Sequence, residues 1–318
     1  IIPTIGESGM RGTWIDDIQT WTSPNPDDDG ISILLSTIKL LMVNHKSLGV
    51  PKTLESTLRM PLEDYEYLIN NLTGIEIKDA NKIMRRVRFV KSEAEIAKIR
   101  HICQITSQGF IDLEGFLRAG ESEQENCRRF KQHLLTLGVD DSPYIVSGSG
   151  QEGYGSIIMG PTDKIIEKGD LFIIDTGSVF DSYFCDFDRN YAFGSIGDEA
   201  KKAYRVAYEA TEAGFNAAQV GNTTSDIFNA MNSVLQKGGA LGNTVGRLGH
   251  GLGMQLTEWP SNTANDNTPL EPGVVLTLEP GLTFLPGKEM VHEENIVITE
   301  DGPEWLSIRA SEELPIIH

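Results

Sequence analysis

Apolar and polar positions alternate differently in two parts of the chain, with the change near residue 90. Before it, apolar side chains recur at helical spacing over residues 30–45 and 60–72, which predicts two amphipathic helices. After it, long helices with capping residues alternate with strongly apolar strands. The change predicts two domains, residues 1–88 and residues 89–318.

The order of predicted elements repeats within the second domain. Two helices precede a set of strands twice, and the second helix of each set aligns with the other at an offset of 101 residues. Ser122 and Glu125 form a capping box in the first copy, and Thr223 and Asp226 occupy the matching positions in the second. Helices on one face of a largely antiparallel sheet give an α+β fold. We therefore predict two pseudo-equivalent halves around one curved sheet.

The stretch LFIIDTGSVFDSYFCDFDRNYAF, residues 171–193, places carboxylates inside an apolar hairpin. If the turn centres on residues 180–181, Asp175 and Asp186 lie opposite each other, about 4.5–5.5 Å apart. Two carboxylates at that distance repel, so one pKa rises unless a cation lies between them. By alternation, Asp188 points to the same face as Asp186. The hairpin therefore predicts a metal ion on this face.

Three further candidate ligands come from other segments. His250 lies between glycines in GHGLG, Glu279 ends an apolar strand, and Glu293 lies on an alternating strand. Each alone has an ordinary structural explanation, so the hypothesis rests on their combination with Asp175 and Asp186. Four carboxylates and one imidazole suit two divalent ions bridged by carboxylates. Two ions about 3.5–4 Å apart activate a water and polarise a carbonyl.

Composition excludes some partners. The 318 residues carry a formal net charge of −19, so a nucleic-acid partner, which needs clustered Lys and Arg, is not expected. No run approaches the ~18 apolar residues of a membrane span, so no membrane partner is expected either. Cys103, Cys127 and Cys185 show no CxxC spacing, which favours a reduced, cytoplasmic protein.

These motifs resemble the pita-bread metallopeptidase family, which includes methionine aminopeptidase, aminopeptidase P, prolidase and creatinase. The resemblance covers residues 90–308, and RFVKSEAEIAKIR, residues 88–100, is similar to the domain entry of the prolidase and creatinase branch. The matching motifs, in order, are DTG at Asp175, Asp186, GHGLG at 249–253, EPG at 279–281, and Glu293 ahead of TEDG.

The resemblance implies a pita-bread fold after a partial creatinase-type N-terminal domain, which we expect to be incomplete. It implies two ions of the Mn, Co, Zn or Fe type and a homodimer whose N-terminal domains help close the active site. The implied reaction is hydrolysis of an amide bond next to an imino nitrogen, as in Xaa-Pro dipeptidase, by a metal-bridged hydroxide. Glu279, as ligand and proton shuttle, and His250 are the implied catalytic residues. The implied ligands are Asp175, Asp186, His250, Glu279 and Glu293.

Four positions depart from the prolidase pattern. Ile158 replaces a His before the strand that begins GDL, Thr257 replaces a second His, and Val291 replaces an Arg before the last Glu. Asp188 stands where relatives have Thr. The first three positions handle the substrate in prolidases, so other residues are needed here. The candidate substrate-binding residues are Asp188, Arg189, Thr257, Glu258, Trp259 and His292.

Three functional readings remain open from the sequence. The chain is a dipeptidase that contacts its substrate through different groups, or a creatinase-like or osmolyte-degrading enzyme that acts on a small non-peptide molecule. A non-catalytic binding protein of the same fold is the third, although the complete ligand set argues against it. GSGQEG, residues 148–153, fits GxGxxG, but no helix follows it, so we interpret it as a loop near the pocket.

Overall fold

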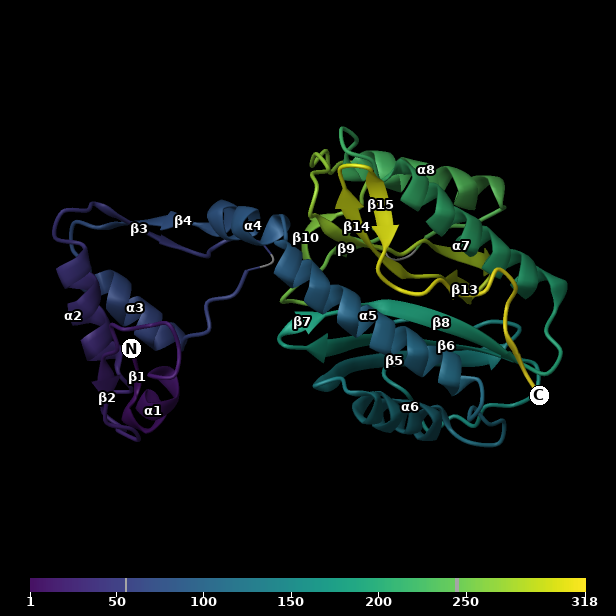
Figure 1. Cartoon of the computed structure of the whole chain (residues 1–318), viewed down its shortest axis with the longest axis horizontal. Helices are drawn as coiled ribbons and strands as arrows, with labels where there is room; N and C mark the ends of the chain where they lie inside the picture. The colour runs from purple at the N-terminus through teal and green to yellow at the C-terminus, as the bar shows by residue number, and fades with distance from the viewer. Residues whose placement is uncertain (55, 244–245) are drawn as a thin grey trace. The chain divides into compact units, whose positions relative to one another are not determined.

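The computed structural model describes residues 1–54, 56–243 and 246–318. It divides the chain into two compact units, Ile1–Arg85 and Arg86–His318 (Figure 1). Helix α4 (Asn81–Phe89) spans this division, so the domain boundary expected after residue 88 falls within the same helix.

The first unit has a small core between two helices. The predicted amphipathic helices are confirmed as α2 (Ile31–Leu41) and α3 (Leu62–Asn71). Leu35, Leu68 and Leu72 are buried between them. The other elements are β1 (Ile2–Pro3), η1 (Thr4–Gly6), α1 (Glu7–Met10), β2 (Thr20–Trp21), β3 (Ser47–Val50) and β4 (Glu76–Asp79), with β1–β2 and β3–β4 paired in parallel.

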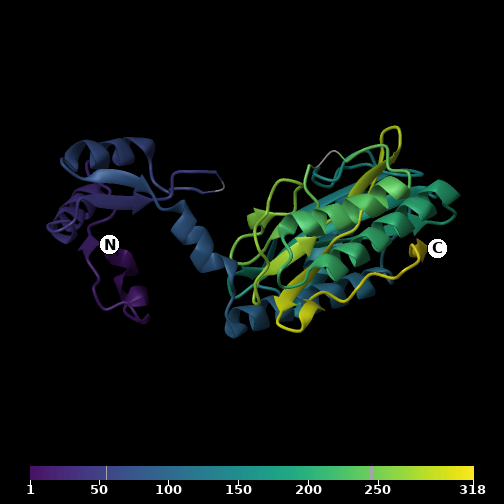
Figure 2. The ribbon, with the colours of Figure 1, turned by 90° about the horizontal axis from the view of Figure 1, so that it is seen from above.

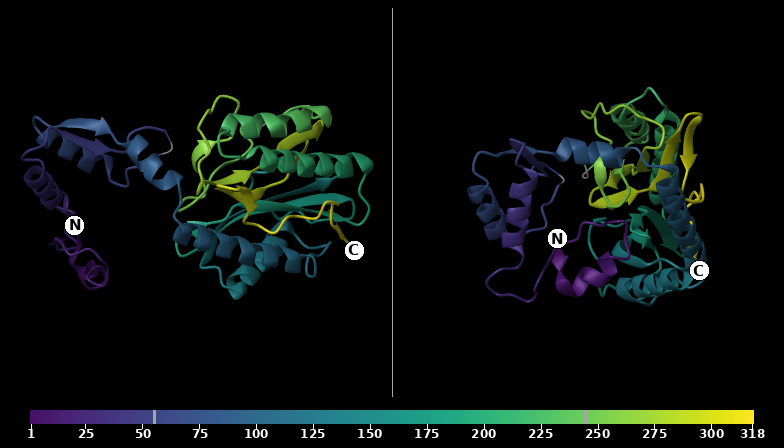
Figure 3. Two further views of the ribbon diagram at one scale, coloured as in Figure 1. Left: turned by 45° about the horizontal axis from the view of Figure 1, so that its top comes forward. Right: turned by 60° about the vertical axis from the view of Figure 1, so that its left-hand side comes forward.

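The second unit contains the predicted repeat of two helices followed by strands. Capping boxes begin three of its helices, at Ser92, Ser122 and Thr223, and the last two are the boxes that the sequence predicts. In Figure 3 (left), one helix pair lies above the strands and the other below them, and Figure 2 shows α7 and α8 side by side. The helices are α5 (Glu93–Leu113), α6 (Glu123–Leu137), α7 (Asp198–Ala217) and α8 (Thr224–Lys237).

The strands of the second unit form two larger sheets and one ribbon. One sheet has the order β16-β8-β6-β5, with β7 paired to β6, and the other has the order β10-β9-β11-β14-β15. Strands β12 and β13 form the ribbon. The bounds are β5 (Asp141–Gln151), β6 (Asp170–Phe180), β7 (Tyr183–Phe184), β8 (Phe187–Phe193), β9 (His250–Gly251), β10 (Glu258–Ser261), β11 (Val275–Leu278), β12 (Gly281–Leu285), β13 (Lys288–Val291), β14 (Glu294–Thr299), β15 (Gly302–Trp305) and β16 (Ile316–Ile317).

Each half of the second unit has its own apolar core. Ile99 of α5 and Phe130 of α6 pack with Phe172 of β6 in one core. Ala207 of α7 packs with Leu276 of β11 in the other. This arrangement confirms the predicted α+β class with two similar halves. Within the described ranges, no helix is both long enough and apolar enough to cross a membrane.

Candidate metal centre

The hairpin that carries the acidic residues has a different register from the predicted one. Asp175 pairs with Asp188, so the predicted pairing of Asp175 with Asp186 is wrong. The turn uses Asp181 and Ser182, one position later than expected, and both have positive φ, 46° and 68°. Positive φ at both central residues is the geometry of a type I′ hairpin turn. The shift by one position moves every partner across the hairpin.

Asp186 still lies beside Asp175, because regular strand structure is interrupted there. Strand β7 ends at Phe184 and β8 begins at Phe187, so Asp186 occupies the break. Its backbone N–H donates to Asn295 Oδ1 at 3.0 Å, and Asn295 Nδ2 donates to its carbonyl. Burial and then repulsion from Asp186 raise the pKa of Asp175 well above its usual value.

Two other predicted ligands also lie at strand breaks. The apolar strand expected to run through Glu279 is two strands, with Glu279 and Pro280 between β11 and β12. Glu293 lies between β13 and β14, immediately before the first residue of β14. Their side chains are therefore placed by the ends of strands, and not by the pleat of a continuous strand.

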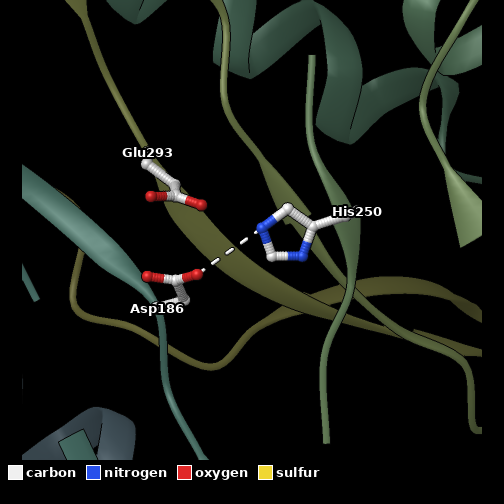
Figure 4. Close-up of side chains that lie close together, drawn as sticks. All are labelled: Asp186, His250 and Glu293. Carbon is white, nitrogen blue, oxygen red and sulfur yellow. Dashed lines mark ion pairs between the residues drawn. The ribbon is translucent and has the colours of Figure 1, made fainter. Parts of the chain in front are cut away.

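Three of the five predicted ligands form a tight cluster (Figure 4). One ligand atom each of Asp186, His250 and Glu293 lies within 4.8 Å of the other two. His250 Nε2 is 3.5 Å from Asp186 Oδ2. The three side chains are buried, with exposed fractions of 4%, 3% and 2%. Segments far apart in the sequence thus meet at one buried point.

The local backbone orients His250 toward this cluster. Its Nδ1–H donates to the carbonyl of Gly251 at 2.8 Å, which leaves the Nε2 lone pair free as a ligand. Gly249 has φ +123°, and a Cβ there would lie 2.2 Å from the carbonyl oxygen of Thr277. The glycines around His250 are therefore required by the close approach of two strands.

The carboxyls of the site lack the partners that buried carboxylates need. Burial is the largest cause that raises the pKa of Asp175, Asp186, Glu279 and Glu293. Within the described residues, Asp175 Oδ1, Asp186 Oδ1 and Glu293 Oε1 are buried and form no hydrogen bond. Buried carboxylate oxygens without hydrogen bonds, together with the free Nε2 of His250, fit a divalent cation of the hard or borderline class.

Asp188 lies next to the ligands and is held by the protein. Asn190 Nδ2 lies 3.5 Å from its Oδ1 and also donates to the Val291 carbonyl at 2.7 Å, two residues before Glu293. It is 1% exposed, and burial raises its pKa well above the usual value. These contacts indicate that Asp188 supports the segment that carries Glu293.

Two candidate substrate-binding residues lie away from the cluster. The Arg189 guanidinium is 3.1 Å from Glu294 Oε2 and also donates to the backbone carbonyls of Glu293 and Ile308. His292 Nδ1 is 2.9 Å from Thr211 Oγ1, beneath α7. The structure does not bring either side chain to the ligands, because Arg189 pairs with Glu294 and His292 contacts α7.

The remaining candidates form the segment that leads from His250 into β10. Glu258 is buried and forms ion pairs with Lys91 at 3.1 Å and Arg88 at 2.5 Å. The Trp259 ring packs against the ring of Phe89 at the end of α4, with 4.8 Å between the ring centroids. Thr257 is half-buried just before β10. Through these ion pairs, Glu258 holds the start of β10 against the connection between α4 and α5. This is a positioning function.

Two residues near the ligands were missed from the sequence. The side chain of Tyr144 of β5 lowers the pKa of Asp175, and burial together with the site's carboxylates raises the Tyr144 pKa. Arg247 lowers the pKa of both Asp186 and Glu279. The position of Arg247 three residues before His250 is a signal that sequence reasoning could have used. The approach of Tyr144 depends on the pairing of β5 with β6, which the sequence does not specify.

The chain is similar to known metallopeptidases. Residues 97–301 match the model of the metallopeptidase family M24. The chain is 26% identical over 269 residues to an Xaa-Pro dipeptidase of Pyrococcus furiosus, covering 84% of this chain and 75% of the relative. It is 30% identical over 225 residues to a probable dipeptidase, PepE, of Mycobacterium tuberculosis, covering 70% of this chain and 60% of the relative.

Solved structures show the same fold. The prolidase from Thermococcus sibiricus superposes with a TM-score of 0.88 at 22% identity, covering 99% of this chain and 83% of that one. The prolidase from Pyrococcus horikoshii superposes with a TM-score of 0.84 at 24% identity, covering 98% and 85%. The expected pita-bread fold is thereby confirmed. The protein is a hydrolase that resembles Xaa-Pro dipeptidases, and with most of its second unit matched by the family model, the chain belongs to metallopeptidase family M24.

Proposed function

We propose that this chain is a two-metal dipeptidase that cleaves Xaa-Pro dipeptides. The observation that carries the proposal is the convergence of Asp186, His250 and Glu293 with buried oxygens that have no hydrogen bond within the described residues. The relatives named as Xaa-Pro dipeptidases support the substrate class.

The proposed ligands are the five residues expected from the sequence. On this proposal, Asp175 and Glu279 are ligands as well. The charges of Asp186 and Glu279 raise the pKa of Asp175, and the charge of Asp186 raises the pKa of Glu279. Four carboxylates carry four negative charges, which two divalent ions of the Mn, Co, Zn or Fe type balance. When bound, such ions would lower the pKa of a water and polarise the scissile carbonyl.

Glu279 is the proposed proton shuttle. It is half-buried, and burial raises its pKa above the usual value, which favours its holding a proton during the reaction. Its carboxylate accepts a proton from the attacking water and delivers it to the imino nitrogen that leaves. His250 contributes an Nε2 that is fixed in orientation by the bond from Nδ1–H to Gly251.

A homodimer and a cytoplasmic location complete the proposal. Both follow from the resemblance and from the sequence, and the three free, buried cysteines fit a reducing compartment. Light scattering tests the dimer, since each chain is 35.0 kDa and the expected mass is twice that value.

Metal analysis and a substrate screen test the function. Purified protein that holds no metal, and whose stability and activity do not respond to added Mn²⁺ or Co²⁺, would refute the metallohydrolase. The screen compares Gly-Pro and Ala-Pro with dipeptides lacking proline and with cyclic or methylated osmolytes. Cleavage of the Xaa-Pro pair alone supports the proposal, while turnover of an osmolyte alone would replace it with the non-peptide alternative.

A further inference from the structure

We propose that Asn295 of β14 and Thr277 of β11 are positioning residues that together set the separation of Asp186 and His250. The inference rests on the proposed function, because it concerns the metal site of that reaction. Neither residue is a proposed ligand. Each instead holds the backbone of a residue that is one.

Asn295 acts at Asp186 as a neighbouring strand would. Asp186 lies in the break between β7 and β8, so neither strand includes it. The Asp186 N–H donates to Asn295 Oδ1 at 3.0 Å, and Asn295 Nδ2 donates to the Asp186 carbonyl. One amide thus satisfies both polar groups of the Asp186 backbone. The exposed fraction of Asn295 is 0%, so these hydrogen bonds are shielded from water.

The surroundings of Asn295 fix the orientation of its amide. Oδ1 also accepts from the Cys103 thiol, whose Sγ lies 3.3 Å away. A flipped amide would place an NH2 group against the Asp186 N–H and an oxygen against the Asp186 carbonyl. The Asn295 backbone is held as well, since its N–H donates to Ser307 Oγ at 3.0 Å and its carbonyl accepts from the Leu306 N–H at 2.9 Å.

Thr277 holds His250 in a similar manner. Thr277 lies directly opposite Asn295 in the antiparallel pairing of β11 with β14, so the two side chains project from the same face. The His250 N–H donates to Thr277 Oγ1 at 3.1 Å, and Thr277 is 0% exposed. A single cross-strand pair therefore fixes the backbones of two residues whose side chains meet, with His250 Nε2 3.5 Å from Asp186 Oδ2.

The separation of the two ligands matters for metal binding. A preorganised site holds its ligands within about 0.5 Å of their bound positions before the ion arrives. Without the ion, buried carboxylates repel one another, which favours a wider site. Hydrogen bonds from paired strands to the ligand backbones oppose this widening. Loss of either contact should therefore weaken metal binding although every ligand remains.

The test titrates Co²⁺ into the metal-stripped full chain by calorimetry and records the visible absorption of the bound ion. Asn295→Leu keeps the size of the side chain and removes both hydrogen bonds, so it should weaken Co²⁺ binding by about 10–100-fold. Thr277→Val should weaken it by about 3–10-fold, the equivalent of one hydrogen bond. Both variants should shift the absorption spectrum, because the coordination geometry changes. Thr277→Ser keeps the acceptor and should bind as the wild type does.

Asn126 on α6 provides a matched control. Its Oδ1 accepts from the Arg118 N–H at 3.2 Å, its Nδ2 donates to the Arg118 carbonyl at 3.4 Å, and it is 0% exposed. Asn126→Leu should lower the melting temperature and leave Co²⁺ affinity and the spectrum unchanged. Equal Co²⁺ losses in Asn126→Leu and Asn295→Leu overturn the inference. Wild-type affinity in Thr277→Val also overturns it, and this measurement decides the matter if Asn295→Leu does not fold.

The double variant tests whether the two residues act on one separation. Its loss of Co²⁺ affinity should be smaller than the product of the two single losses, because the first substitution already releases the distance that the second residue holds. A fully multiplicative loss overturns the joint role.

Activity separates this inference from the proposed function. A wild type that binds Co²⁺ but cleaves no Xaa-Pro dipeptide refutes the proposed function, and the titrations still decide the positioning role. A wild type that binds no Co²⁺ refutes both.

Discussion

Glu293 and Glu294 are adjacent carboxylates with opposite surroundings. Glu294 is fully buried, and its Oε2 accepts hydrogen bonds from Arg189 at 3.1 Å and from Ser307 Oγ at 2.5 Å. Its Oε1 accepts one from the Ala310 N–H at 2.9 Å. The charge of Glu294 is therefore met by a cation and two further donors within the protein.

Glu293 is 2% exposed and has no such compensation. Its Oε1 forms no hydrogen bond within the described residues, and burial and repulsion from Asp186 and Glu279 raise its pKa well above the usual value. Burial alone thus does not distinguish a structural carboxylate from a functional one. The distinguishing observation is the oxygen that the rest of the protein leaves without a partner.

The largest expected effect comes from substituting Glu293. Glu293→Gln should lose bound metal and lower kcat/KM on the order of a thousandfold or more, because the metal site loses an anionic ligand. Metal analysis together with steady-state kinetics measures both quantities. Full metal content in this variant would remove Glu293 from the ligand set.

The next effect is on stability and belongs to Glu294. Glu294→Gln leaves Arg189 buried without its counter-ion, so the free energy of unfolding should fall by about 3–5 kcal/mol in urea titrations. Glu304→Gln is the matched control, because Glu304 pairs with Arg100 at the surface and should change stability by less than about 1 kcal/mol. Similar losses in the two variants would contradict the comparison.

A smaller effect is expected at Asp188, which is linked through Asn190 to the segment just before Glu293. Asp188→Asn keeps an acceptor but removes the charge, and should weaken metal affinity by about 10–100-fold, as residues that support ligands do. Metal titration of the stripped protein measures it. The loss of one whole metal equivalent would instead make Asp188 a ligand.

The smallest effect appears in the pH dependence of the metal-free protein. The folded pKa of Glu293 is raised, so its favourable contribution is complete below the unfolded value of about 4.3 and is lost as pH rises toward the folded value. Glu293→Gln should therefore melt about 2–4 °C above wild type at pH 8, with the difference shrinking toward pH 4. Calorimetric scans after chelation test this, and a difference independent of pH would count against it.

The elements that the sequence predicted well are those specified by local interactions. Capping boxes at Ser122 and Thr223 and the helical spacing of apolar residues define α6 and α8. The repeat of those signals also revealed the two halves. The order of the motifs along the sequence grouped Asp186, His250 and Glu293 as candidate metal ligands. The structure places these three residues together.

The failures concern interactions between distant segments. The hairpin turn at Asp181 and Ser182 lacks the Asn or Gly that usually marks a type I′ turn, so the register was misassigned. Arg189 was a substrate-binding candidate because the sequence could not reveal that Glu294 is its ion-pair partner. Arg247 was missed because the neighbouring Leu248 meets Glu279 through a backbone hydrogen bond between segments that are distant in the sequence.

The strand breaks that carry Asp186, Glu279 and Glu293 bear on how this protein tolerates inherited change. The paired strands on either side supply the hydrogen bonds of the sheets, so a new side chain at a break removes catalysis and leaves the ladder intact. A duplicated gene can therefore lose these ligands one at a time and still encode a folded protein. The fold can therefore give rise to related proteins that bind peptides without cleaving them.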